Sequence, residues 1–170
     1  MVAFDASMLI DLFNPKLNGE RRQRLDLLVK NLTELRQKIV VPAPAYTEFM
    51  VGAIGARDDY QARIDQTSSF RVEPFDKKAS VECAFLLSKA LTSKDRGNIT
   101  KTKFKFDWMI VAVAKTVPGL KCIYCGDDDV MRYASRAGID AVHVDALPLP
   151  AQTDWIGSQG DQPAGNSASE

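Results

Sequence analysis

The chain has 170 residues, 45% of them hydrophobic, with 22 Lys and Arg residues against 22 Asp and Glu residues. This length predicts one domain that buries roughly 70% of its unfolded surface, and the apolar fraction excludes a wholly disordered chain. A net charge of zero argues against a nucleic-acid binder that relies on a strong overall positive field. Three cysteines are too few for a disulfide framework and favour a reducing, cytoplasmic location. No apolar run approaches the ~20 residues of a membrane span, so no membrane partner is expected.

The composition changes near the end of the chain. Residues 1–148 carry the apolar patterns of a folded domain, whereas residues 149–170 are rich in Pro, Gly and Ser. A segment of that kind buries too little apolar surface to offset the entropy lost on ordering. We therefore predict one domain followed by a flexible C-terminal tail.

The first half of the chain predicts two strands and four helices. Val2–Phe4 is a short apolar strand, and Ser7 stands where an N-cap would precede the first helix. The second helix is indicated by leucines at spacings of three and four, namely Leu25, Leu28, Leu32 and Leu35. The elements that follow are a strand at Ile39–Pro42, a helix capped by Thr47 with Phe49, Met50 and Ile54 on its apolar side, and a helix around Asp59–Gln66.

The second half continues the alternation. In chain order it predicts a strand at Phe70–Phe75, a helix opened by Asp76, a loop at Lys94–Lys103, a helix at Phe106–Val117, a strand at Cys122–Tyr124, a helix at Asp127–Arg136 that Gly138 ends, and a strand at Ile139–Val144. Alternating strands and helices are typical of an α/β fold with a mainly parallel sheet. In such sheets, sites form beyond the carboxyl ends of the strands.

Four carboxylates occupy positions that this rule singles out. Asp5 and Asp127 follow predicted strands, while Glu48 and Asp107 lie in the opening turns of helices beside large apolar residues. If these groups converge, they repel one another unless a cation compensates. Hard divalent ions such as Mg²⁺ prefer oxygen ligands and can hold a phosphodiester for hydrolysis. For any single carboxylate, favourable placement near a helix N-terminus explains its position equally well.

Four segments carry a resemblance to a known family. They are Val2–Ile10, Pro44–Phe49, Phe106–Ala112 and Gly126–Asp129, and in this order they resemble the PIN-domain nucleases over about residues 2–145. In size the chain is similar to the VapC-type toxins of that family. The resemblance implies a three-layer α/β/α sandwich with a short, mainly parallel sheet. It also implies a metal-dependent endoribonuclease that hydrolyses RNA with Mg²⁺, or with Mn²⁺ as a substitute.

The resemblance also assigns roles to individual residues. The family's catalytic and metal-binding acids fall on Asp5, Glu48, Asp107 and Asp127, and Asp129 matches an additional acidic metal position present in many members. Two further residues match supporting positions. Ser7 matches a small hydroxyl position near the first acid, and Cys125 stands where many members carry Thr or Ser. A thiol is the weaker hydrogen-bonding group, so the orientation of the fourth acid is in question. Asp128, between two of these acids, is expected to face solvent.

The sequence also suggests basic residues that contact RNA, and the resemblance implies protein partners. Lys101, Lys103 and Lys105 lead into Asp107 and would hold RNA phosphates if their segment overhangs the acids, although a solvated charged loop explains them equally well. Members of the toxin type imply a small antitoxin protein as partner and a homodimer.

Two other functions compete with this interpretation. Gly126–Asp129 also resembles the last motif of haloacid-dehalogenase-like phosphatases, with Asp5 as nucleophile, but Ser7 stands where that family needs a second Asp. A non-catalytic scaffold with the same fold has no use for four mutually repelling acids.

Cys122 and Cys125 form a C-x-x-C pair whose odd spacing on a strand turns the thiols to opposite faces, which argues against redox or zinc chemistry. His143 is the single histidine and is expected to pack in a strand.

Overall fold

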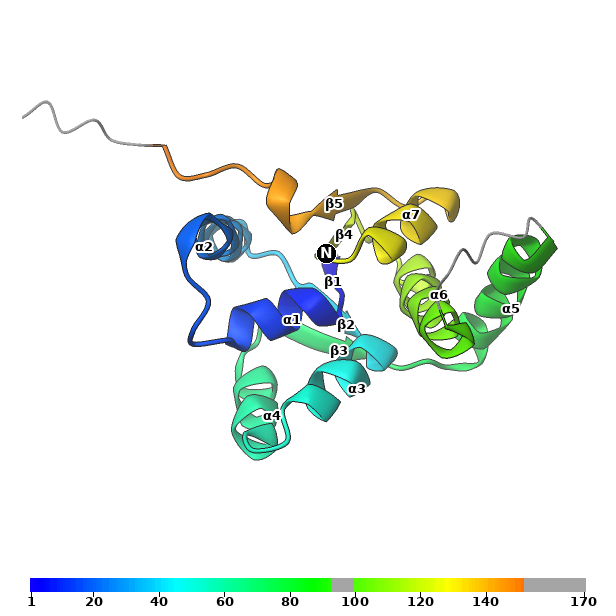
Figure 1. Cartoon of the computed structure of the whole chain (residues 1–170), viewed down its shortest axis with the longest axis horizontal. Helices are drawn as coiled ribbons and strands as arrows, with labels where there is room; N and C mark the ends of the chain where they lie inside the picture. The colour runs from blue at the N-terminus through cyan, green and yellow to red at the C-terminus, as the bar shows by residue number, and fades with distance from the viewer. Residues whose placement is uncertain (93–99, 152–170) are drawn as a thin grey trace, which may run out of the picture.

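A parallel sheet of five short strands forms the middle of the molecule (Figure 1). The computed structural model describes residues 1–92 and 100–151. The strand order is β3-β2-β1-β4-β5, and every pairing is parallel. The strands are β1 (Val2–Phe4), β2 (Ile39–Pro42), β3 (Phe70–Glu73), β4 (Ile123–Cys125) and β5 (Ala141–His143). Since all strands point the same way, their carboxyl ends share one edge, which is where the predicted acids follow β1 and β4.

Helices cover both faces of this sheet. In the described part of the chain they are α1 (Ala6–Phe13), α2 (Gly19–Glu34), α3 (Ala43–Gly52), α4 (Arg57–Gln66), α5 (Lys77–Thr92), α6 (Lys101–Thr116), α7 (Asp128–Arg136) and a short 3-10 turn, η1 (Val144–Ala146). Figure 1 shows α5, α6 and α7 on one side of the sheet, with α1, α2 and α4 on the other. The predicted three-layer α/β/α architecture is confirmed.

Alternation along the strands builds a separate core on each face. Ala3, Val40 and Ile123 turn toward α5, α6 and α7, where Trp108 and Tyr133 stack with ring centroids 4.7 Å apart. The flanking strand residues turn to the opposite face and pack with α1, α2, α3 and α4; among them are Val2, Phe4, Ile39 and Val41. Strands buried on both faces explain the continuous apolar runs of β1 and β2. The predicted strands of residues 70–75 and 139–144 are shorter than expected, because their outer residues lie outside the ladder.

Three helices, α1, α3 and α6, start at residues other than those predicted. Asp5, and not Ser7, caps α1 by accepting a hydrogen bond from the Met8 amide. Helix α3 begins at Ala43, so Thr47 lies inside it and its hydroxyl donates to the Ala43 carbonyl oxygen at 2.9 Å. The helix can begin this early because a proline in the first turn, here Pro44, is compatible with helical geometry. The helix ends before Ile54, which is 78% exposed and not part of the core.

Helix α6 begins five residues earlier than predicted. Thr100 caps it by accepting from the Lys103 amide at 3.2 Å, so Lys101–Lys103 are helical and not part of a loop. The helix then buries an unbroken apolar run, Ile110–Ala114, against α5 and the sheet. Residues 93–99 and most of the predicted tail, residues 152–170, lie outside the described residues. Within the described ranges, no helix combines the length and hydropathy needed to cross a membrane.

Candidate metal centre

The capping of two helices places two of the predicted acids at the carboxyl edge of the sheet. Asp5 follows β1 and caps α1, while Asp127 follows β4 and caps α7 by accepting from the Asp129 amide at 2.8 Å. Both residues have extended backbone conformations, which is the geometry of an N-cap. Because β1 and β4 are neighbours in the sheet, the two carboxylates lie at the same edge.

A network of hydrogen bonds fixes Asp5, which is only 1% exposed. The Met8 amide donates to Oδ1 at 2.9 Å, and the Gly126 amide donates to Oδ2 at 3.3 Å. The Ser7 hydroxyl oxygen lies 2.7 Å from both carboxylate oxygens and accepts from the Gly126 amide at 2.9 Å. A hydroxyl has one proton and donates to one of these oxygens at a time, so the other keeps a lone pair that can face a cation. These contacts place the Ser7 hydroxyl directly between the Asp5 carboxylate and the Gly126 amide.

Three other carboxylates meet around the ammonium group of Lys103. Its Nζ atom lies 3.0 Å from Asp107 Oδ2, 2.9 Å from Asp127 Oδ2 and 3.0 Å from Asp129 Oδ2. Burial lowers the pKa of Lys103, but its hydrogen bonds to the three aspartates outweigh burial and raise that pKa above its ordinary value. Lys103 is therefore a permanent cation at the point on which the three acids converge.

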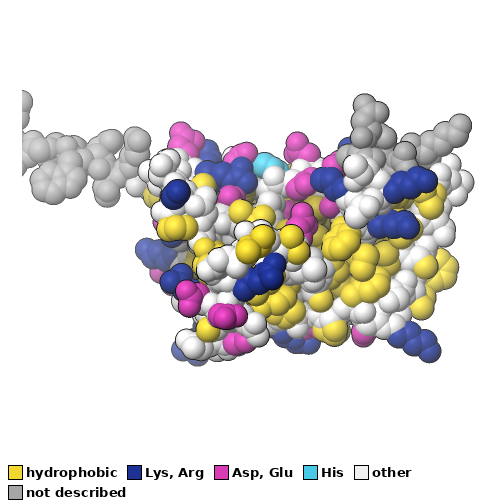
Figure 2. Space-filling model, turned by 60° about the horizontal axis from the view of Figure 1, so that its bottom comes forward, with side chains coloured by type: hydrophobic (Ala, Val, Ile, Leu, Met, Phe, Trp, Pro, Cys, Tyr) yellow, Lys and Arg dark blue, Asp and Glu magenta, His cyan; other side chains and the backbone are white. Residues whose placement is uncertain are grey.

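Glu48 stands at the rim of the same site. It lies on α3, is exposed, and lines a groove of about 440 Å³ between α3 and α6 together with Thr102, Lys103 and Asp107. Figure 2 shows acidic side chains gathered near the centre of one face, with Lys and Arg side chains beside them and hydrophobic side chains below. Glu48 thus faces the acidic group across the groove without the burial of Asp5 and Asp107.

The acids influence one another electrostatically. Burial raises the pKa of Asp5 to about 6, against hydrogen bonds that lower it, and the charge of Asp127 raises it further. Burial likewise raises the pKa of Asp107 to about 6, against the opposing attraction of Lys103. The pKa of Glu48 is raised by desolvation and by Asp127. Asp127 itself is partly buried, but the hydrogen bond from Lys103 lowers its pKa. Asp127 is therefore the common electrostatic neighbour of the other three predicted acids.

The remaining predicted residues take different places. Asp128 has a side chain that is 89% exposed, as expected. Lys101 and Lys105 are exposed on α6, whereas the Lys103 ammonium is held by the acids. Cys125 is buried, its thiol lies 3.8 Å from the Val142 carbonyl oxygen, and burial raises its pKa to about 12. The thiol thus contacts backbone groups of both Val142 and Asp127.

Three residues outside the acidic set, the two cysteines of the C-x-x-C pair and the histidine, lie as the sequence predicted. Cys122 packs in the core on the α1 and α2 side, and Cys125 packs in the opposite core, so the two thiols do not face each other. His143 ends β5, and its Nδ1 atom accepts a hydrogen bond from the Asp145 amide at 3.2 Å.

The donor set fits a hard divalent cation, but the oxygens do not form a ready cage. All five predicted ligands offer carboxylate oxygens, the type that Mg²⁺ prefers. Within residues 1–92 and 100–151, however, no three His, Cys, Asp or Glu side chains are arranged to hold a metal ion as they stand. Asp107, Asp127 and Asp129 surround Lys103 at hydrogen-bonding distances, whereas Mg²⁺ needs its oxygens at roughly 2.1 Å.

Sequence reasoning missed the contact of Lys103 with the acids and the contribution of Arg21. The i, i+4 spacing of Lys103 and Asp107 on one helix was a usable signal for the first. Arg21 binds Asp11 at 2.7 Å and Asp145 at 3.3 Å, and its guanidinium packs against Gly126. No local pattern in the sequence indicates the contact between Arg21 and Asp145, because the two residues are 124 positions apart.

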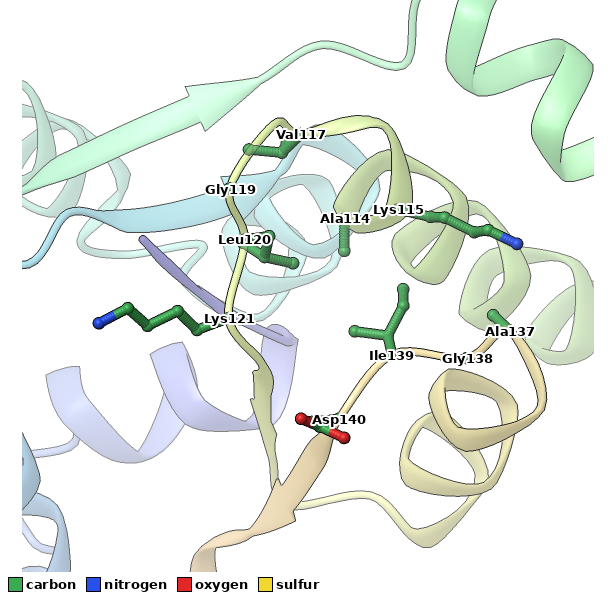
Figure 3. A pocket seen from close by; sticks show the side chains of 10 residues that line it. All are labelled: Ala114, Lys115, Val117, Gly119, Leu120, Lys121, Ala137, Gly138, Ile139 and Asp140. Carbon is green, nitrogen blue, oxygen red and sulfur yellow. The ribbon is translucent and has the colours of Figure 1, made fainter.

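A pocket at the opposite edge of the sheet has none of this chemistry. Figure 3 shows the side chains of Ala114 and Ile139 facing each other across it, while Lys115 and Lys121 point away. The pocket has a volume of about 370 Å³, and Asp140 is the one acidic residue in its lining. The acidic cluster at the carboxyl edge is therefore the stronger candidate for a functional site.

Comparison with solved structures places the fold. No protein-family model and no curated protein matches the sequence. A chain in the crystal structure of DNA-bound VapBC from Salmonella typhimurium is similar in structure, with a TM-score of 0.54. The fold is that of a VapBC chain. The match covers 85% of this chain and 99% of the other, at 16% sequence identity, and at this identity the VapBC likeness concerns the fold.

Proposed function

We propose that this protein is a divalent-metal-dependent endoribonuclease of the PIN-domain type. The observation that carries the proposal is the convergence of Asp107, Asp127 and Asp129 on one point at the carboxyl edge of the sheet. Asp5 is fixed at the same edge by the Gly126 amide. The similarity to a VapBC chain supports the fold that this function requires.

The acids would hold one or two Mg²⁺ or Mn²⁺ ions. Asp5, Glu48, Asp107, Asp127 and Asp129 are the ligands we assign. When bound, the cation would lower the pKa of a water molecule and neutralise the charge that develops on a phosphate. The chain supports this chemistry by keeping Asp5 and Asp127 rigid as helix caps, and by holding Ser7 between Asp5 and the Gly126 amide.

The substrate class follows from the groove beside the acids. The groove between α3 and α6 is open to solvent along Glu48 and Thr102 and leads to Asp107. Lys101 and Lys105 are exposed on the same helix as Asp107 and are placed to attract phosphates of a nucleic-acid backbone. We assign RNA as the substrate on the resemblance of the acidic motifs.

A protein partner fits the exposed apolar surface. Val51 and Ile54 near the end of α3, and Val81 and Phe85 on α5, are between 51% and 78% exposed. Contiguous apolar patches on a surface mark interaction sites, and Figure 2 shows hydrophobic side chains gathered on one face of the molecule. We propose that the chain is the toxin of a VapBC-type pair, that a small antitoxin protein binds it, and that it forms a homodimer.

Growth arrest on expression, relieved by a small protein encoded beside it, would support the toxin role, whereas unaffected growth would favour housekeeping RNA processing.

The proposed activity is tested by RNA cleavage with a matched pair of variants. Asp107 is buried in the site, whereas the Asp128 side chain is exposed, so Asp107→Asn and Asp128→Asn remove the same charge from different environments. We expect the wild type and Asp128→Asn to cleave a pool of structured RNAs with Mg²⁺ or Mn²⁺, and not with EDTA. Asp107→Asn should lose at least about 99% of the cleavage rate, because a ligand is lost.

The assay also separates the alternatives. Cleavage by Asp107→Asn at the wild-type rate would contradict the assignment of this residue. Metal binding without RNA cleavage, together with hydrolysis of a small phosphomonoester, would favour the phosphatase. Absence of metal binding would favour a scaffold.

A further inference from the structure

We propose that Lys103 is an internal counter-ion that occupies the acidic centre in the metal-free protein and leaves it when a divalent cation binds. This inference rests on the proposed metal-dependent function and names how access to that site is controlled. It concerns a residue that the sequence pointed to only as a contact for RNA phosphates.

The contacts of Lys103 match an ammonium group to the three acids. An ammonium has three N–H donors and no acceptor. Asp107, Asp127 and Asp129 each present one oxygen at 2.9–3.0 Å from Nζ, so each donor has one carboxylate partner. The three acids come from two helices and a helix cap, and without a cation among them they would repel one another.

Lys103 and a metal ion cannot share this position. A divalent ion bound by the same three oxygens would draw them to roughly 2.1 Å, and Nζ now stands among those oxygens. The absence of a ready cage among the described acids has the same cause, because the oxygens are spaced for an ammonium. Metal binding therefore requires the lysine to move.

The Lys103 side chain has room to leave the acidic centre. Lys103 lies in the first turn of α6 and has a flexible four-carbon stem, its side chain is 40% exposed, and it lines the open groove beside Glu48. Its ammonium can leave toward Glu48 or toward solvent by rotation of its own side chain, with the helix in place. Arg132 remains within 2.6 Å of Asp129, so one acid keeps a positive neighbour after the exchange.

The exchange has two opposite consequences for a variant that lacks the ammonium. Lys103→Met keeps most of the side-chain length and removes the competitor, so metal should bind more tightly. The same change removes the ammonium that the three acids share, and although Arg132 still contacts Asp129, the metal-free protein should unfold at a lower temperature. A lysine with a purely structural role would change the second property and leave the first unaltered.

The test combines calorimetry with Mn²⁺ and thermal unfolding in EDTA. Lys105→Met is the matched control, because Lys105 is exposed on the same helix and its loss changes the net charge equally. We expect Lys103→Met to bind Mn²⁺ about tenfold or more tightly than the wild type and to unfold at a lower temperature in EDTA. Lys105→Met should do neither.

A second measurement uses the wild type and does not depend on the stability of a variant. Acetylation of lysine amines, followed by mass spectrometry, should find Lys103 protected in EDTA and reactive with saturating Mn²⁺, while Lys105 reacts in both conditions. Unchanged or weaker Mn²⁺ binding by Lys103→Met, or protection of Lys103 that persists with bound Mn²⁺, would overturn the exchange and leave the proposed nuclease intact. Failure of every protein to bind Mn²⁺ would overturn the proposed function itself.

Discussion

Asp5 and Asp107 are carboxylates buried against the core, and burial makes their ionised forms costly. Asp5 is 1% exposed and Asp107 is 4% exposed, and the pKa of each is raised from 3.8 to about 6. A pKa that is raised on folding means that the folded state binds the proton more tightly than the unfolded state. The stabilising contribution is present below the unfolded pKa and is lost as the pH rises through about 6.

The metal-free protein should therefore be more stable at mildly acidic pH. In urea unfolding with EDTA, we expect the free energy of unfolding to fall by about 1–3 kcal/mol between pH 5 and pH 7.5. Asp107→Asn should show a smaller fall and be at least as stable as the wild type at pH 7.5, because it removes one of the two buried charges. Stability that stays constant or rises over this interval would contradict the raised pKa values.

At the scale of residues, chain position predicted the acids better than their contacts. Asp5 and Asp127 could be located because each follows a strand, and parallel strands share an edge. The contact of Lys103 with Asp127 and Asp129 could not be predicted, since it depends on how α6 is oriented against α7. The acidic motifs alone likewise do not indicate that the ammonium group of Lys103 lies among these carboxylates.

The turn between β4 and α7 is the element on which the site depends most closely. Gly126 lies in this turn, and a Cβ atom built on it would lie 2.6 Å from a guanidinium nitrogen of Arg21 and 3.0 Å from the Ser7 hydroxyl oxygen. Arg21 is tied to Asp11 and Asp145 and therefore cannot move freely aside. The turn thus needs a residue without a side chain for the Ser7 and Asp5 contacts to form.

Gly126→Ala should destabilise the protein, whereas Gly52→Ala should not. A Cβ at Gly52, the last residue of α3, meets nothing within 4 Å. We expect Gly126→Ala to lose about 1–3 kcal/mol of unfolding free energy through overpacking, and Gly52→Ala to gain up to about 1 kcal/mol from reduced chain entropy. Urea unfolding in EDTA measures both. Equal stability of the two variants would show that the β4–α7 turn tolerates a side chain.

At the scale of elements, the order of strands and helices was predictable, and several helix starts were not. The apolar runs of β1, β2 and β4 are clear because both faces of each strand are buried. Helices α3 and α6 begin earlier than expected, at a proline-containing turn and at a basic run. Lysines are good helix formers, so once Thr100 provides a cap the charged residues of α6 become helical instead of looping.

For the whole molecule, zero net charge conceals a separation of charges. Parallel strands and capped helices collect acids at one edge, and Lys103 offsets part of this charge locally. Figure 2 shows this acidic region beside basic and apolar surface on one face. In the function we propose, this arrangement would supply a cation site, contacts for an anionic backbone and a surface for a protein partner.

Mn²⁺ binding by two neighbouring aspartate variants is the most direct test of the acidic centre as a cation site. Asp127→Asn removes a charge that contacts Lys103, and asparagine still caps α7, while Asp128→Asn removes an exposed charge one residue away. By calorimetry, we predict that Asp127→Asn weakens Mn²⁺ binding by about tenfold or more, and that Asp128→Asn binds as the wild type does. Equal binding by both variants would contradict the assignment of this edge of the sheet as the metal centre.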